Sequence, residues 1–417
     1  MYEAVLLATH IELGGSTQSV FAAEFDSPMP TPVITDGLRE VFRRQPMLRA
    51  RLAGQAPGWR FVFDVQFPDL DIRTTDLSCA SADEVLAAEC DNPLDLERGP
   101  LWRILLGTDG SSGAGGVTLA VVTFAHAIVD GVSVFAFLQQ LLAAVNGRAR
   151  GAEPFQVRPP LESGLPPAVS EDAVPVPPAA GQWPFAESAP IGQRRTNIVR
   201  GRIGKEVFEP ILLRCRAEGV KVEGFFTASI QGALAHTSPA ALSLPVLSTF
   251  DARTLMDPSV PRDEMGLFMK DIQLFDAAWQ ADGLDVWERA RSVSSIIVEE
   301  RHRGLAQLAE NSAEETIQQI KLVAAYPLDG FAFGFSVSNV GRQFLDRSGP
   351  AGLKSFCPGS PDRIGIMGFQ VALVEMGGDM HVTFVHTAPL ISAETISQLL
   401  EGLTEIVQRE ARETTHA

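Results

Sequence analysis

Two apolar runs joined by one short polar turn constrain the fold of this chain most strongly. The run GVTLAVVTF at 116–124 is almost continuously apolar, which predicts a buried central strand. The run VSVFAFLQQLLAAVNG at 132–147 has helical spacing of its apolar residues and ends on a glycine. The turn between them, HAIVDG, contains His126, Asp130 and Gly131. Because α/β folds present functional side chains at the carboxyl ends of their strands, this turn is a candidate functional site.

A proline-rich stretch divides the 417 residues into two parts. Residues 151–195 have no sustained period and predict a linker lying on a surface, with one lobe at 1–150 and a second at 196–417. Each part mixes strands and helices, which predicts two α/β lobes. We predict helices at 33–44, 81–91, 205–219, 222–236, 284–304 and 391–410, and strands at 59–65, 101–107, 196–203, 244–251, 331–339, 363–377 and 380–386.

The composition excludes several classes of protein. A formal charge of −17 disfavours binding to nucleic acid or to anionic membranes. The N-terminal segment lacks a positive region, and no apolar run approaches the ~20 residues that span a bilayer. Cys79, Cys90, Cys215 and Cys357 are scattered without a CxxC pair, which favours free buried thiols over a zinc site. We therefore expect a cytoplasmic protein with no nucleic-acid partner and no stable membrane insertion.

The polar turn has a purely structural interpretation. Asp130 would cap the helix that begins at Val132, Gly131 would serve a tight backbone, and His126 would be a core histidine. A metal site built on His126 and Asp130 is disfavoured because no third ligand has suitable spacing.

Five segments in order favour a functional interpretation instead. HAIVDG resembles the HxxxDG signature of a superfamily that includes nonribosomal peptide synthetase condensation domains, chloramphenicol acetyltransferase and alcohol acyltransferases. QPMLRARL, NPLDLERGPLWRILL, DARTLMDPSVPRDEMGLFM and SNVG resemble further motifs of that superfamily, and together they span nearly the whole chain. Two departures, Ala125 in place of a second histidine and Lys270 in place of an asparagine, favour a stand-alone acyltransferase of the polyketide-associated or alcohol type.

The resemblance implies a fold and a reaction. The fold would be α/β (α+β two-layer sandwiches), with two chloramphenicol-acetyltransferase-like lobes forming a V-shaped pseudo-dimer around a tunnel. The reaction would be acyl transfer from acyl-CoA or a carrier-protein phosphopantetheine thioester to a hydroxyl or amine, in natural-product biosynthesis or lipid decoration. No cofactor would be bound permanently and no metal would be needed. A neutral imidazole can accept the acceptor's proton near pH 7, so His126 is the expected general base.

The resemblance also assigns supporting roles. Asp130 would pair with Arg253 from the second half, although a lone arginine is more often a solvated surface charge. Gly131 would allow close backbone approach at the tunnel. Ser338 or Asn339 of the SNVG segment would lie near the oxyanion or the acceptor, or would only mark the end of a strand.

Other candidates are weaker. GFSVS at 334–338 is not a G-x-S-x-G nucleophile elbow, and neither glycine-rich stretch, at 14–19 or 110–116, follows the dinucleotide-binding pattern. The remaining histidines considered lack the strand–turn–helix setting: His10, His236, His302, His381 and His386, the last of which ends a strand.

The expected partners are a small-molecule acceptor and, for one class of donor, an acyl or peptidyl carrier protein; we expect a monomer. The acidic total charge favours CoA over an acidic carrier protein as the donor. Three alternatives stay open: a stand-alone condensation enzyme that joins carrier-bound partners, a catalytically inactive recruitment domain, and an isomerase or cyclase that reuses the same histidine.

Overall fold

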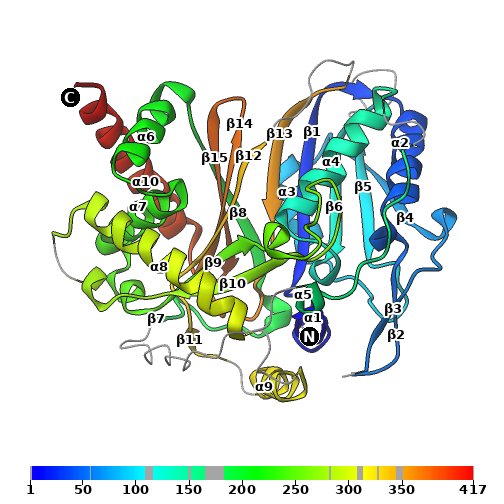
Figure 1. Cartoon of the computed structure of the whole chain (residues 1–417), viewed down its shortest axis with the longest axis horizontal. Helices are drawn as coiled ribbons and strands as arrows, with labels where there is room; N and C mark the ends of the chain where they lie inside the picture. The colour runs from blue at the N-terminus through cyan, green and yellow to red at the C-terminus, as the bar shows by residue number, and fades with distance from the viewer. Residues whose placement is uncertain are drawn as a thin grey trace.

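The computed structural model shows two lobes side by side, each built on its own mixed sheet (Figure 1). It describes residues 2–56, 58–108, 116–148, 152–164, 183–280, 283–307, 313–325, 328–343 and 351–416. The glycine-rich stretch at 110–116 lies mostly outside the described residues, as does 165–182 within the expected linker. None of the helices in these described ranges is long and apolar enough to cross a membrane.

The N-terminal lobe has a five-stranded sheet within the described residues. Its strands are, in spatial order, β13 (Leu353–Gly359), β1 (Gln18–Met29), β6 (Val117–Ala125), β5 (Trp102–Thr108) and β4 (Asp71–Asp76). Only β4 and β5 pair in parallel. The nearly continuous apolar run is β6, and it lies at the centre of this sheet as predicted.

Helices cover both faces of the N-terminal sheet. A first core packs α2 (Thr31–Arg44) and α4 (Gly131–Val145) against one face, and a smaller one packs α3 (Ala82–Cys90) against the other. Ser81 caps α3 through a capping box with Glu84. The remaining elements of this lobe are α1 (Tyr2–Glu12) and the ribbon of β2 (Arg51–Ala53) with β3 (Arg60–Val62).

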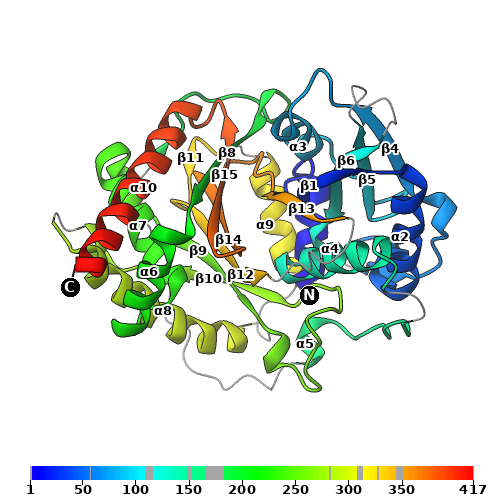
Figure 2. The same cartoon turned by 90° about the horizontal axis from the view of Figure 1, so that it is seen from above.

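The C-terminal lobe has a six-stranded sheet in the described part of the chain. The order is β10 (Met269–Leu274), β9 (Val246–Asp251), β12 (Ser336–Gln343), β14 (Phe369–Met376), β15 (Asp379–Ala388) and β8 (Arg195–Ile203). One face packs against α6 (Lys205–Ala217), α7 (Val222–Thr237), α8 (Val286–Gln307) and α10 (Ala393–His416). The view from above shows these helices on the side away from the N-terminal lobe, so the other sheet face is turned toward that lobe (Figure 2).

One strand crosses between the lobes. β13 follows the C-terminal strand β12 in the sequence, yet it pairs antiparallel with β1 at the edge of the N-terminal sheet (Figure 1). The division into 1–150 and 196–417 is therefore wrong for 353–359, because β13 completes the first sheet and adds Phe356 to its core. The N-terminal sheet is therefore built from both halves of the chain.

The described parts of the proline-rich stretch are not wholly a surface linker. They include α5 (Leu161–Gly164) and β7 (Trp183–Pro184), which pairs with β11 (Gly330–Phe331). Leu161, Trp183 and Phe185 are buried in the core of the C-terminal lobe, since aromatic side chains gain most from leaving water. Of the cysteines, three are buried as expected, whereas Cys79 is exposed.

Candidate active site at the lobe interface

His126 follows β6 directly and begins a short 3-10 turn, His126–Ile128. Its backbone N–H donates to the carbonyl oxygen of Thr17 at 3.1 Å, which ties the turn to the residue before β1. The imidazole is half-buried and lines a cavity of about 230 Å³. Nδ1 is buried and has no hydrogen-bond partner among the described residues.

The walls of this cavity come from both lobes. The N-terminal lobe contributes Tyr2, Thr17 and Phe21 beside His126. The facing side of the C-terminal sheet contributes five polar side chains: Thr249, Asp271, Ser336, Ser338 and Gln370. The cavity therefore lies where the two sheets approach each other, and the predicted general base is part of its lining.

Asp130 caps helix α4 and also bonds to residues of the C-terminal lobe across the lobe interface. Its side chain caps α4 by accepting from the backbone N–H of Ser133 at 2.8 Å. Arg253 donates to both of its oxygens, at 2.8 and 3.0 Å, and the backbone N–H of Phe268 donates at 2.8 Å. The capping role and the ion-pair role considered for Asp130 thus coexist in one carboxylate.

The pair of Asp130 and Arg253 is almost completely enclosed, with 2% and 1% of the side chains exposed. Burial by itself would raise the pKa of Asp130, but the Arg253 guanidinium and the two backbone N–H donors lower that pKa below its usual value. Burial would likewise lower the pKa of Arg253, but Asp130 and Asp251 raise it. The guanidinium also lies 4.8 Å from the ring centroid of Phe268.

Ser133 is a supporting residue that the sequence analysis missed. Its hydroxyl accepts from Arg253 at 2.8 Å and from the backbone N–H of Gly266 at 3.0 Å, and it lies 2.7 Å from the carbonyl oxygen of Gly266. In the segment 251–269, which contains Gly266, the carbonyl oxygen of Asp263 accepts hydrogen bonds from the side chains of Gln45 and Gln140. The segment resembling the family motif at 251–269 therefore docks on the N-terminal lobe. No local pattern marks Ser133, because its partners lie more than 100 residues away.

Gly131 permits close approach of the two lobes. A Cβ added there would lie 3.2 Å from Cγ2 of Val340 on β12. Its backbone is not in the left-handed region, so the requirement is space and not conformation.

The SNVG segment lies inside β12 and not after a strand. Ser338 lines the cavity beside His126, and the hydroxyl of Thr249 lies 3.4 Å from it. Asn339 instead lines a small adjoining space of about 50 Å³ next to Asp130, and its side chain accepts from the N–H of Gly341 at 3.0 Å. The structure thus brings Ser338, but not Asn339, to the main cavity.

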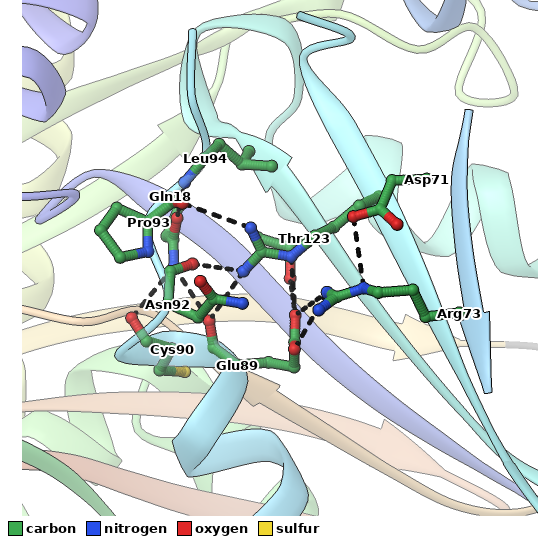
Figure 3. Close-up of polar contacts among 10 residues, drawn as sticks. Gln18, Asp71, Arg73, Glu89, Cys90, Asn92, Pro93, Leu94 and Thr123 are labelled. Atoms are coloured by element: carbon green, nitrogen blue, oxygen red, sulfur yellow. Dashed lines mark hydrogen bonds and ion pairs between the residues drawn. The ribbon is translucent and has the colours of Figure 1, made fainter. Parts of the chain in front are cut away.

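A buried polar network holds the start of β1, where Gln18 pairs with Ala125 at the end of β6 (Figure 3). The amide of Gln18 donates to the carbonyl oxygens of Glu89, Cys90 and Asn92 and accepts from the N–H of Leu94. Arg103 pairs with the carboxylate of Glu89 at 2.7 Å and also donates to Asn92. Three residues of the NPLDLERGPLWR motif take part in this network: Asn92 and Leu94 bond to Gln18 on β1, the strand that pairs with β6, and Arg103 bonds to Asn92.

The other described histidines lie outside the cavity lining. His10 is buried, with Nε2 2.9 Å from the carbonyl oxygen of Leu94. His236 is exposed, and His381 and His386 lie on opposite faces of β15. The side chain of His302 lies outside the described residues. Gly14 and Gly15 form the turn between α1 and β1, and a Cβ on Gly15 would lie 2.7 Å from Cβ of Pro93.

No group of three or more His, Cys, Asp or Glu side chains in the described ranges is arranged to hold a metal ion. The site therefore consists of the imidazole of His126 in a cavity that has polar side chains on one wall. The ion pair between Asp130 and Arg253 holds the turn that carries this imidazole.

Comparison with solved structures identifies the fold. No family model matches the sequence, and no curated protein matches it. Trichothecene 15-O-acetyltransferase from Fusarium sporotrichioides superposes with a TM-score of 0.72 at 11% identity, over 98% of this chain and 93% of that one. Polyketide synthase associated protein 5 from Mycobacterium tuberculosis gives a TM-score of 0.63 at 14% identity, over 97% of each chain.

The similarity extends to domains of peptide synthetases. The epimerization domain from the third module of tyrocidine synthetase B gives a TM-score of 0.65 at 12% identity, over 95% of this chain and 91% of that one. The predicted fold class is confirmed. The chain shares its two-lobed fold with an O-acetyltransferase, a polyketide synthase associated protein and an epimerization domain of a peptide synthetase.

Proposed function

We propose that this protein is an acyltransferase that moves an acyl group from a thioester to a hydroxyl or amine acceptor. The observation that carries the proposal is His126, whose half-buried ring lines a cavity between two lobes of an acyltransferase-type fold. Since Nδ1 is buried, Nε2 is the nitrogen available to a substrate. A base in a largely enclosed site can take a proton in the reacting complex without competition from bulk water.

The reaction needs no covalent enzyme intermediate, because a thioester is already activated. The acceptor oxygen or nitrogen attacks the thioester carbonyl carbon while His126 takes the acceptor's proton. The tetrahedral intermediate then collapses, the carbon–sulfur bond breaks, and the proton passes to the departing thiolate. The products are an ester or amide and a free thiol.

Asp130 and Arg253 act in this proposal as positioning residues. Neither residue lines the main cavity. Their ion pair joins the turn that carries His126 to the segment 251–269, which packs on the N-terminal lobe. Gly131 lets the same turn approach β12. Ser338 is the better candidate than Asn339 to donate to the developing oxyanion, because it shares the cavity with His126.

We propose CoA as the carrier of the donor acyl group, with carrier-protein phosphopantetheine as the second possibility, and natural-product biosynthesis or lipid decoration as the setting. The structural relatives include an O-acetyltransferase and domains of peptide synthetases, so the fold serves both kinds of chemistry. The formal charge of −17 disfavours docking of an acidic carrier protein. The thioester is a co-substrate here and not a resident cofactor.

The test is thiol release from a panel of acyl-CoAs and acyl-carrier proteins, in the presence of hydroxyl and amine acceptors. We expect release that depends on the acceptor and is abolished by His126→Ala, with an unchanged circular dichroism spectrum for the variant. Release from carrier-bound donors alone would favour a condensation enzyme. A product without a gained acyl group would favour an isomerase, and silence with tight binding of a partner protein would favour a recruitment domain.

A further inference from the structure

The cavity wall opposite the N-terminal lobe carries a row of polar side chains across three strands. In the register of β9 and β10, Asp271 lies opposite Thr249. In the parallel pairing of β9 and β12, Ser336 lies opposite Leu247, which places Ser338 beside Thr249. Sheet faces that are covered by another layer are normally apolar, so a polar row at this position indicates contact with a ligand and not packing.

Asp271 gives this row a charge. Among the described lining residues it is the one carboxylate, and none of them is a lysine or arginine. The hydroxyl of Tyr2 donates to Oδ2 of Asp271. Because an ionised carboxylate offers about four lone-pair sites, this one bond leaves acceptor capacity for a ligand.

Lys270 compensates part of the charge of Asp271: burial lowers the pKa of Lys270, and attraction to Asp271 and Glu162 opposes that shift. Lys270 is the neighbour of Asp271 in β10, so its side chain leaves the other face of the strand. Its Nζ lies 5.1 Å from the ring centroid of Tyr2, and it is not part of the cavity lining. A ligand in the cavity therefore meets the carboxylate of Asp271 on the C-terminal side, with no lysine or arginine in the described lining, and the imidazole on the other side.

We propose that Asp271 determines acceptor specificity by pairing with a positively charged amino group of the acceptor. The inference rests on the proposed acyl transfer, since it assigns the acceptor class for the same cavity. The acceptor is an amine-bearing small molecule: its ammonium group pairs with Asp271 while a hydroxyl or second amine reacts at His126. An acceptor with a carboxylate at that position meets repulsion and is disfavoured.

Three probes on one phenolic frame test this assignment: tyramine carries an ammonium group, tyrosol a neutral hydroxyl, and 4-hydroxyphenylacetate a carboxylate. Binding to the full-length protein is measured by titration calorimetry, and turnover by thiol release from acetyl-CoA. The matched variants are Asp271→Asn, which keeps the size and can still accept from Tyr2, and Glu209→Gln, which removes the same charge from an exposed pair with Lys205.

We expect the wild-type protein and Glu209→Gln to bind tyramine more tightly than tyrosol and to bind 4-hydroxyphenylacetate least. Asp271→Asn should weaken tyramine binding about tenfold or more, change tyrosol binding less than about twofold, and remove the discrimination against the carboxylate. An equal effect of Asp271→Asn on all three probes, or a wild-type protein that does not prefer tyramine, overturns the assignment.

The two proposals fail differently. If thiol release never depends on His126 while tyramine binding still depends on Asp271, the acyl transfer is wrong and the cation site stands. If release depends on His126 but the charge preference is absent, the acyl transfer stands and the cation site is wrong.

Discussion

At the scale of single residues, buried charge decides how far each side chain can be altered. Asp130 accepts four hydrogen bonds, two from Arg253 and two from backbone N–H groups, and neither partner of the ion pair has contact with bulk water. Removing one partner leaves the other charge buried and uncompensated. Exposed pairs, such as Asp36 with Arg39 on α2, lack this dependence because water solvates each charge alone.

The first prediction concerns Asp130→Asn, which retains an acceptor for the helix cap but removes the charge. We expect it to lower the free energy of unfolding by about 3 kcal/mol, because Arg253 loses its counter-charge. Urea denaturation measures the change, with Asp36→Asn as the exposed control that should leave stability unaltered. An Asp130→Asn protein as stable and active as the wild type would refute the positioning role.

The second prediction concerns pH and His386. Burial lowers the pKa of His386 from 6.5 to about 4, and neither ring nitrogen has a hydrogen-bond partner among the described residues. The unfolded chain therefore binds a proton that the folded chain does not, and the stability contributed by this site is lost as the pH falls below 6.5. The expected slope is about 1.4 kcal/mol per pH unit until the folded group itself titrates.

Replacing this ring should remove the contribution of His386 to the slope. We expect the slope of the unfolding free energy against pH to be about 1.4 kcal/mol per pH unit smaller in His386→Leu than in the wild type between about pH 6 and 5, with exposed His236→Leu as the control. Glu223 and Asp362, whose burial raises their pKa values to about 7 and about 6, contribute slopes of the opposite sign in both proteins. Chemical denaturation at several pH values is the measurement. An identical slope in wild type and His386→Leu would mean that another group governs the acid limb.

At the scale of elements, the contact between α4 and β12 sets the spacing of the lobes at the cavity. Gly131 begins α4, and Val340 lies on β12 directly across from it. A methyl group on Gly131 would lie 3.2 Å from Cγ2 of Val340, closer than ordinary van der Waals contact. Because the turn that carries His126 precedes Gly131, any shift of α4 moves the imidazole as well.

The third prediction follows from that contact. Gly131→Ala should lower kcat/KM about tenfold or more, because small displacements of a reacting group are costly. Val340→Ala should restore much of the loss in the double variant by vacating the space. Additive effects of the two substitutions would show that the contact does not couple the elements.

At the scale of the whole molecule, β13 makes the lobes interdependent. Phe356 on this strand has its ring centroid 5.5 Å from that of Phe21 and 4.3 Å from that of Phe135, both in the N-terminal lobe. The edge strand of the first sheet is thus supplied by the second half of the chain. A fragment ending near residue 150 would expose β1 as an unpaired edge.

The fourth prediction is that Phe356→Ala destabilises the N-terminal lobe by about 3–5 kcal/mol, although the substitution lies in the C-terminal half. Hydrogen exchange followed by mass spectrometry should show faster exchange in β1 than in the wild type. Exposed Lys354→Ala on the same strand is the control. Loss of protection confined to the C-terminal sheet would contradict the observed strand order.

Local pattern determined much of this architecture. The apolar run before His126 predicted a buried strand, the run after Asp130 had the period of a helix, and Asp130 was predicted to cap it in the structural interpretation of the turn; the structure has all three features. The ordered motifs implied the two-lobed fold, which the comparisons confirm. These features depend on residues that are neighbours in the sequence.

Only the tertiary structure decided the rest. β13 is a short strand containing a proline and a glycine, and its place in the first sheet comes from a β1 partner more than 300 residues away. Ser133 and Asp271 likewise gain their roles from groups on the other lobe. The cavity itself exists because two separately formed sheets meet, and the sequence has no local signal for how sheets approach each other. Side-chain period specifies which face of an element is buried, whereas packing of whole layers specifies what that face meets.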